Sequence, residues 1–586
     1  MKVEFRARPQ CETTLAAAQR AGFSPLTARL IAGRVESFSG DLRSVVEAGL
    51  GNLSDPEGLR DCDGAARRLV RAIAEHEPIG LVTDYDVDGI TSHALLLDAL
   101  IEHFGVPAAQ VQGFIGHRLT EGYGLSDPVV DRILAASPVP AVVITADCGS
   151  SDEARIARLK AAGVDVIVTD HHGLGEAGPP ASAYATVNPV RDDCDYPDGS
   201  IAGCMVAWLL MAQVRKCLIA DGHLPADAPK LGGLLDFVSL GTVADAVSLF
   251  SPSNRAVVQA GLTVMNRLGR PCWRAMARLL KRETFVVDDL GFQLGPRINA
   301  RGRMDEPKAA LRFLRATDDA AADSALAVLD DNNRQRKEAE QRMLAVARAQ
   351  AESALTPASQ STVVFNEAFH PGVQGIVASR LVELTGRPAV VLSPGREDGQ
   401  LTGSARSVPG LDIRAAIAEA HDHLPEHFHA FGGHPGAAGL TIAREGLDPF
   451  VLAFAVAVRG QMGDVQLGPV CWTDGALEPM QIAIETLKEC DCLSPYGREF
   501  ESPVFDGRFA VVALRPVGDG THLALELSAG GQQFRAIWFR ARKDAEAPLP
   551  VEEGVTVRCA YRMERDSWRG NDKVQLVVVH AAPDGA

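Results

Sequence analysis

The chain has few aromatic residues, no C-x-x-C cysteine pair and no long uninterrupted apolar run. No stretch approaches the roughly 20 apolar residues of a membrane-spanning helix, and the first residues lack the apolar segment of a signal peptide. The 11 cysteines are scattered and odd in number, which argues against a disulfide framework or a zinc ribbon. We therefore expect a cytoplasmic protein that has no membrane partner.

Positive charge is also scarce. The sequence has 58 Lys and Arg residues against 75 Asp and Glu residues, a net charge of −17. Such a chain repels polyanions at long range, so any contact with nucleic acid requires local basic clusters or bound cations. With 586 residues, 46% of them hydrophobic, the chain is long enough for roughly four domains of about 150 residues.

Between about residues 50 and 249, short β-branched runs alternate with helical patterns, which predicts a parallel sheet covered by helices. Four runs end in aspartate: IGLVTD at Asp84, AVVITAD at Asp147, VDVIVTD at Asp170 and FVSLGTVAD at Asp245. In open α/β sheets the ligand crevice lies beyond the carboxyl ends of the strands. We therefore expect four carboxylate-bearing strand ends at one edge of the sheet.

Composition and hydrophobic periodicity divide the rest of the chain into three regions. Residues 306–356 are rich in Ala, Leu, Glu and Arg and predict a long helical connector, and a second α/β lobe follows in 357–462. Residues 463–586 contain five strand-like segments separated by turns, which favours a small barrel of the OB type. The predicted division is therefore an N-terminal segment (1–50), an α/β catalytic lobe (51–305), the connector, the second lobe and the barrel.

The loop after the first run, DYDVDG, places Asp84, Asp86 and Asp88 at alternate positions. Carboxylates crowded in this way are neutralised by a divalent cation. An EF-hand loop also begins D-x-D-x-D-G, but it needs a Glu at its twelfth position, where this chain has Leu95, and it follows a helix instead of a strand.

The other strand ends add Asp147, the Asp170-His171-His172 sequence and Asp245. All-oxygen sites suit magnesium, and imidazole ligands admit softer metals, so Mn²⁺ or Mg²⁺ is the expected cofactor. Two such ions bridged by one carboxylate would hold an attacking water and a leaving oxygen, as in two-metal phosphoesterases.

In their order, DYDVDG, the Asp-x-Gly strand end, TDHH and VAD resemble the DHH phosphoesterase superfamily. Further motifs are similar to the RecJ family of bacterial single-strand-specific exonucleases, and the resemblance covers nearly all of the chain. These motifs are GPRINARGRM (295–304), FHPGVQGIVASRLVE (369–383), TGSARS (402–407) and FGGHPGAAG (431–439).

The resemblance implies roles for individual residues. Asp147 would bridge the two metals, Asp84 would be an auxiliary ligand, His172 would face the scissile phosphate, and Asp170 would orient an imidazole. The remaining implied metal ligands are Asp86, Asp88, His171 and Asp245.

The resemblance also implies a substrate path. Arg118 and Arg297 would reach the 5′ end of the strand, and Ser379, Arg380 and His434 would hold its terminal phosphate. The same motifs supply further expected substrate-binding residues: Asn299, Arg303, Ser404, Arg406 and Gly433. In the barrel, basic residues alternate with aromatic residues, which is typical of a surface that binds single strands by base stacking. Some of these aromatic side chains must nevertheless pack in the barrel core. These aromatics are Phe534, Trp538, Phe539, Tyr561 and Trp568.

The chain departs from the family pattern at several places, none of which removes an implied ligand. It has TDYDVDG, ADCGSS and INARGR where the family usually has GDYDVDG, VDNG and INAAGR, and Arg498 follows Pro-Tyr-Gly where the family has a Gly-Asn. The effects of Cys148, Arg301 and this altered loop are open at this point.

The predicted function is a metal-dependent 5′→3′ exonuclease that degrades single-stranded DNA to 5′-mononucleotides in recombination and repair. The family context implies a single-strand-binding protein and a helicase as partners of a monomeric enzyme. One alternative is a DHH phosphodiesterase for short oligonucleotides or cyclic dinucleotides, which usually lacks the barrel. Another is an inactive member that only binds nucleic acid, although such proteins lose motif carboxylates or histidines that are present here.

Overall fold

The computed structural model describes residues 3–36, 38, 41–117, 120–304, 308–356, 358–566 and 573–584, with only the backbone of 301–304. The chain forms two compact units. We call Gln10–Asn333 with Asp491–Ser502 the N-terminal unit, and Met1–Pro9, Arg334–Cys490 and Pro503–Ala586 the C-terminal unit. Neither unit is one continuous stretch of chain.

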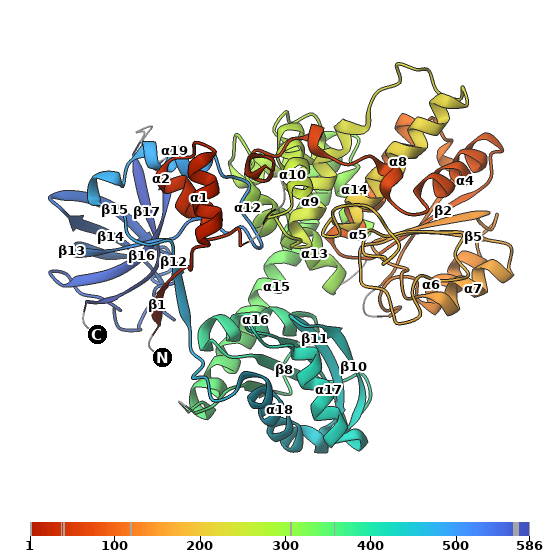
Figure 1. Cartoon of the computed structure of the whole chain (residues 1–586). Coiled ribbons are helices and arrows are strands. Elements are labelled where there is room, and N and C mark those ends of the chain that lie inside the picture. The colour runs from red at the N-terminus through yellow and green to blue at the C-terminus, as the bar shows by residue number, and fades with distance from the viewer. Residues whose placement is uncertain are drawn as a thin grey trace. The chain divides into compact units, whose positions relative to one another are not determined.

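A five-stranded parallel sheet lies at the centre of the N-terminal unit, as the sequence predicts, in the order β3-β2-β4-β5-β6. Its inner strands are buried on both faces because alternate side chains point to opposite sides. Ile144 joins one apolar cluster, with α4, α5, α8 and α9, while Val143 joins another, with α6 and α7. Figure 1 shows α4 and α8 on one side of the sheet and α6 and α7 on the other. The strands are β2 (Ile79–Thr83), β3 (Val111–Ile115), β4 (Val142–Ala146), β5 (Asp165–Thr169) and β6 (Ala185–Val187).

Helices cover this sheet and extend beyond it. Among the described residues one helix, α8, is long and apolar enough to cross a membrane, but 67% of it is buried, as in a core helix. The helices of this unit are α1 (Glu12–Arg20), α2 (Pro25–Ala32), α3 (Leu42–Val46), α4 (Cys62–Ala74), α5 (Val87–Leu97), α6 (Asp127–Leu134), α7 (Glu153–Ala161), α8 (Gly203–Ala220), α9 (Leu235–Ala244), α10 (Pro252–Met265), α11 (Pro271–Leu280), α12 (Val287–Asp289), α13 (Gly295–Met304) and α14 (Lys308–Leu314).

The prediction of a strand that ends at Asp245 is wrong. Residues 235–244 form helix α9, and Asp245 is its C-terminal cap. The run is apolar on every side because α9 is buried between α5, α8 and α10. Its hydrophobic residues therefore show no periodicity by which a helix could be distinguished from a strand. Asp245 therefore reaches the site from a helix end.

The predicted helical connector is confirmed by α14 and by α15 (Asp319–Ala354), which passes from one unit to the other. The second α/β lobe has a mixed five-stranded sheet in the order β10-β11-β9-β8-β7. On β8, Val390 packs with α17 and α18, and Val391 packs with α15 and α16. The elements are β7 (Thr362–Phe365), α16 (Gln374–Thr385), β8 (Ala389–Pro394), β9 (Gln400–Arg406), α17 (Ile413–His423), β10 (Phe428–His434), β11 (Ala437–Ala443) and α18 (Leu447–Met462).

The five strands predicted near the C-terminus close into a barrel in the order β13-β14-β15-β17-β16. Beside it, β1 pairs in parallel with β12. The remaining elements are β1 (Glu4–Ala7), β12 (Val470–Thr473), α19 (Ile484–Asp491), β13 (Phe505–Val517), β14 (His522–Ala529), β15 (Gln532–Trp538), β16 (Thr556–Arg565) and β17 (Val574–Pro583).

The barrel aromatics serve mainly as core. Phe534, Trp538 and Tyr561 are buried, whereas Phe539 is 57% exposed. Trp568 lies outside the described residues. The predicted stacking platform is therefore reduced to Phe539 among the described members of that aromatic set.

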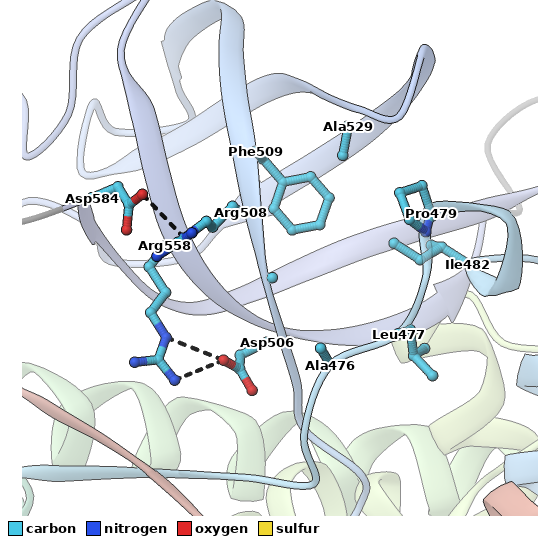
Figure 2. Close-up of a pocket in the computed structure, with 11 residues that line it drawn as sticks. Ala476, Leu477, Pro479, Ile482, Asp506, Arg508, Phe509, Ala529, Arg558 and Asp584 are labelled. Carbon is cyan, nitrogen blue, oxygen red and sulfur yellow. Dashed lines mark hydrogen bonds and ion pairs between the residues drawn. The ribbon is translucent and has the colours of Figure 1, made fainter.

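A pocket of about 450 Å³ opens on the barrel, with the Phe509 ring and the Pro479 turn forming its apolar wall (Figure 2). Arg558 contacts Asp506 at 2.8 Å, and Arg508 contacts Asp584 at 3.1 Å. Because each of these arginines faces a carboxylate, the pocket adds little net positive charge for a phosphate backbone.

Candidate metal centre

The aspartates of the first three runs lie together because their strands are parallel and in register. Thr83, Ala146 and Thr169 are paired across β2, β4 and β5, so the residue after each one leaves the sheet at the same edge. These next residues are Asp84, Asp147 and Asp170, all buried. The predicted meeting of strand ends is thus present for three of the four runs.

The loop after β2 turns directly into helix α5, whose N-terminal cap is Asp86. Gly89 is required there because a Cβ would collide with the Asp84 carbonyl group. The carboxylate of Asp88 accepts backbone N–H groups from Gly203 at 2.7 Å and Cys204 at 3.0 Å. The N-terminus of α8 therefore fixes this buried carboxylate.

His171 lies among three carboxylates. Its Nε2 is 3.2 Å from Asp147 Oδ1, 3.6 Å from Asp245 Oδ2 and 3.9 Å from Asp88 Oδ2. Among the residues that the structure describes, ligand atoms within 4.8 Å of one another form three possible metal-holding groups, and Asp147 belongs to two of them. The groups are Asp147-His171-His172, Asp88-His171-Asp245 and Asp84-Asp86-Asp147.

The carboxylates at this edge of the sheet repel one another. Burial and the neighbouring carboxylates raise the pKa of Asp88, raise the pKa of Asp147 well above its usual range, and raise that of Asp245 to about 8. Burial lowers the pKa of His171, which keeps its imidazole neutral and able to donate a lone pair. Without a counter-charge, these carboxylates do not all ionise at neutral pH. A bound dication would supply that counter-charge.

The donor atoms fit a divalent ion. Asp147 Oδ1 and His171 Nε2 are buried and make no hydrogen bond within the part of the chain that the structure describes. Leaving such atoms unpaired costs about 1–3 kcal/mol each, more for a charged group. Carboxylate oxygens with one imidazole form the mixed set that accepts Mn²⁺ as well as Mg²⁺.

Asp170 faces the histidines as an acceptor. It accepts the backbone N–H groups of Ser150, His171 and His172, and it lies 2.8 Å from His172 Nδ1. Although burial alone would act in the opposite directions, this pair lowers the pKa of Asp170 to about 2 and raises that of His172 to about 9. His172 is therefore a cation at neutral pH in the metal-free protein.

Tyr123 also belongs to this site, although no sequence motif predicts it. Its hydroxyl donates to the Asp147 carbonyl oxygen at 3.0 Å and lies 3.4 Å from both ring nitrogens of His172. Tyr123 lies in a turn with no periodic pattern, so nothing local indicates this contact. Nearby, burial raises the pKa of Cys148 well above its ordinary value, and the side chain has no exposed surface, so the thiol is protected from oxidation.

Replacing Asp170 by Asn should destabilise the metal-free protein in a pH-dependent way. The lowered pKa of Asp170 contributes stability above about pH 4, and the raised pKa of His172 contributes below about pH 6.5 and is lost as the pH rises through 9. After discounting for the partly exposed His172, the largest loss should be about 1–2 kcal/mol between pH 4 and 6.5.

Urea unfolding in chelator from pH 4 to 9.5 tests this pH dependence. Asp131→Asn is the control, because Asp131 lies exposed on α6, where it pairs with Arg158 of α7. A difference between Asp170→Asn and the parent that stays constant across this range would contradict the prediction.

The predicted substrate residues of the N-terminal unit are only partly described. Arg297 is buried on α13, donates to Asp330 at 2.9 Å and lies on the same helix as Asn299. Arg118 lies outside the described residues, and Arg301 and Arg303 are described only in their backbone. Arg297 is therefore held by a carboxylate that a phosphate would have to displace.

Four of the predicted substrate residues of the C-terminal unit lie on the strands of its sheet, and the other two lie on α16. Ala437 on β11 pairs with both Arg406 on β9 and His434 on β10, and Gly433 adopts φ +139° beside them. On α16, Arg380 contacts Glu383 at 2.8 Å. The other members are Ser379, whose hydroxyl donates to the Gly375 carbonyl, and Ser404 on β9.

Comparisons with known proteins agree with this architecture. Residues 78–242 match the profile of the DHH family, N-terminal domain, 359–458 match the DHHA1 domain, and 473–580 match the RecJ OB domain. The chain is 34% identical over 592 residues to the single-stranded-DNA-specific exonuclease RecJ of Dickeya dadantii, with 99% of each chain covered.

Two solved structures are similar over the whole chain. RecJ from Thermus thermophilus in complex with Mn²⁺ has a TM-score of 0.77 at 26% identity and is covered over 80% of its length. The Mg²⁺ complex from the same organism has a TM-score of 0.72 at 25% identity, with 79% of its length covered. Each comparison covers 100% of this chain.

Proposed function

Because the chain belongs to the RecJ family of single-stranded-DNA-specific exonucleases, we propose that it degrades single-stranded DNA from the 5′ end to 5′-mononucleotides. It is a metal-dependent phosphodiester hydrolase that uses Mn²⁺ or Mg²⁺. The observation that carries the proposal is the intact cluster around Asp147 and His171, whose buried ligand atoms are 3.2 Å apart. An inactive binding protein would have no need to maintain this costly arrangement.

The residues around the cluster would have distinct tasks. Two bound dications would supply a nucleophilic water of lowered pKa and neutralise charge on the leaving oxygen. Asp147 would be a ligand shared by both ions, and Asp86, Asp88, His171 and Asp245 would be the other metal ligands. Asp84 would act as an auxiliary ligand.

His172 would stabilise the negative charge that develops on the scissile phosphate. Asp170 holds its Nδ1 edge, which keeps the imidazole protonated and fixes the orientation of the ring. Tyr123 would support the same ring, since its hydroxyl lies 3.4 Å from both ring nitrogens, and it would hold the Asp147 backbone in place. Charge stabilisation by groups positioned in advance is the main contribution a protein makes to phosphoryl transfer.

The C-terminal unit would bind the strand. Ser379, Arg380 and His434 would hold the terminal phosphate, and Ser404, Arg406 and Gly433 would add further strand contacts in this unit. In the N-terminal unit, Arg118 and Arg297 would reach the 5′ end of the strand, and Asn299 and Arg303 would add contacts to it. The domain division at residues 51–305, 306–356, 357–462 and 463–586 belongs to the same proposal. We also propose a monomeric enzyme of the cytoplasm, with a helicase and a single-strand-binding protein as partners in recombination and repair.

The test is a comparison of substrates. The purified protein is incubated with a 5′-labelled single strand, the same strand blocked at either end, a blunt duplex, and a dinucleotide, each with Mn²⁺, Mg²⁺ or chelator. We expect mononucleotides from the 5′ end of the single strand, dependent on metal, and little cleavage of the duplex. Hydrolysis confined to the dinucleotide would instead identify a phosphodiesterase for short substrates, and binding without turnover an inactive member.

A further inference from the structure

The segment Asp491–Ser502 comes from the C-terminal part of the sequence but packs within the N-terminal unit. Its centre is a tight turn in which Gly497 and Phe500 exchange backbone hydrogen bonds at 3.0 and 3.1 Å. Buried Arg255 on α10 donates to the carbonyl oxygens of Leu493 at 2.8 Å and Pro495 at 3.0 Å. The segment is thus built into the unit by its main chain.

This segment contacts the turn that follows Asp245. The N–H of Leu249 donates to the Arg498 carbonyl oxygen at 2.9 Å, and Arg498 Nη1 donates to the carbonyl oxygen of Ala246 at 3.2 Å. Gly497 fits closely against Leu249, because a Cβ there would come within 2.6 Å of its side chain. The turn of residues 245–249 is therefore held at both of its ends.

The turn needs such support because its own geometry is strained. Ala246 has φ +56°, in the left-handed region that non-glycine residues rarely adopt. Asp245 lies at the end of α9, where a helix frays most readily, and its carboxylate must still lie within 3.6 Å of His171. An outside contact on the Ala246 carbonyl fixes the peptide that follows the carboxylate-bearing residue.

We propose that Arg498 is a positioning residue for the metal centre: by holding the Ala246 carbonyl, it keeps the Asp245 carboxylate beside His171, where both would serve as ligands of a divalent ion. The inference rests on the proposed metal site. It gives the loop that departs from the family pattern a defined task, although no metal ligand lies within it.

A positioning role and simple electrostatics predict opposite changes in metal affinity when Arg498 is replaced. Arg498 is a cation beside a cation-binding cluster, so removing its charge should tighten metal binding if only long-range repulsion mattered. Loss of positioning should weaken it. For Arg498→Ala we expect Mn²⁺ to bind about 3- to 10-fold more weakly, the range for one charge-assisted hydrogen bond at a partly exposed position. Arg498→Lys, which keeps one donor, should recover most of the affinity.

The experiment titrates Mn²⁺ into the full-length, metal-free protein and follows free Mn²⁺ by electron paramagnetic resonance. Thermal unfolding in chelator is recorded for each variant. Arg67→Ala is the matched control, because Arg67 is a similarly exposed arginine with an ion pair to Asp63 on α4. Its affinity should equal that of the parent, and the metal-free Tm of Arg498→Ala should change little.

Several results would overturn the inference. Unchanged or tighter Mn²⁺ binding by Arg498→Ala would do so, and so would a lower metal-free Tm with parental affinity, which means a purely structural role. A raised KM for the strand with parental Mn²⁺ affinity would make Arg498 a strand contact instead. Asp245→Asn is the reference: if it binds Mn²⁺ like the parent, the proposed metal site itself is wrong, whatever Arg498 does.

Discussion

Asp147→Asn should lose hydrolysis of single-stranded DNA by at least on the order of 10³-fold while retaining strand binding. Removing one charge-stabilising group already costs about 10²–10³-fold in typical enzymes, and Asp147 belongs to two of the three possible metal-holding groups. Asparagine is the suitable replacement because Asp147 adopts φ +62°, which Asn tolerates better than Ala. The fold should therefore survive the change.

Two measurements check this prediction. Single-turnover hydrolysis of a labelled strand gives the loss of rate, and fluorescence anisotropy of the same strand in chelator gives its affinity. Asp131→Asn, on the exposed face of α6, should match the parent in both. Near-parental turnover by Asp147→Asn would show that the assignment of Asp147 as the shared ligand is wrong.

Arg255→Met should lower the stability of the N-terminal unit by about 3–5 kcal/mol. Arg255 has no exposed surface, and its guanidinium donates to four carbonyl oxygens, those of Val46, Leu249, Leu493 and Pro495. Burial lowers its pKa to about 10, so it remains a cation at neutral pH. Methionine would fill similar space but leave four buried acceptors without their donor.

Pulse proteolysis in increasing urea, with the cleaved peptides identified by mass spectrometry, measures this loss within the N-terminal unit. Peptides around 46, 249 and 491–502 should become cleavable at lower urea than in the parent. Arg67→Met provides the comparison, since Arg67 is exposed and an ion pair at the protein surface contributes little to stability. A parental urea midpoint for Arg255→Met would contradict this account of the buried arginine.

Local patterns in the sequence were sufficient for most of the architecture. The runs before Asp84, Asp147 and Asp170 are continuous and apolar because their strands are buried on both faces, and parallel register then brings the three aspartates to one edge. The turn residues between the barrel strands were enough to predict where each strand begins and ends approximately. The run before Asp245 was misread, because a helix buried on all sides has the same composition as a buried strand.

The parts that sequence reasoning missed depend on contacts between distant residues. Gly203 and Cys204 cap Asp88 from 115 and 116 positions away. Tyr123 reaches Asp147 across 24 positions, from an irregular loop. Arg255 contacts a segment about 240 positions downstream. No periodicity or spacing encodes these pairings, which follow only once the chain is folded.

The discontinuity of the N-terminal unit has a consequence for biosynthesis. When Asn333 leaves the ribosome, the acceptors that Arg255 needs at Leu493 and Pro495 have not yet been translated. Ser502 lies 169 residues beyond Asn333, and all of these must be synthesised before it emerges. At about 5–20 residues per second this delay is on the order of 10–30 s. Nascent chains halted before residue 491 should therefore carry an immature, protease-sensitive 245–249 turn.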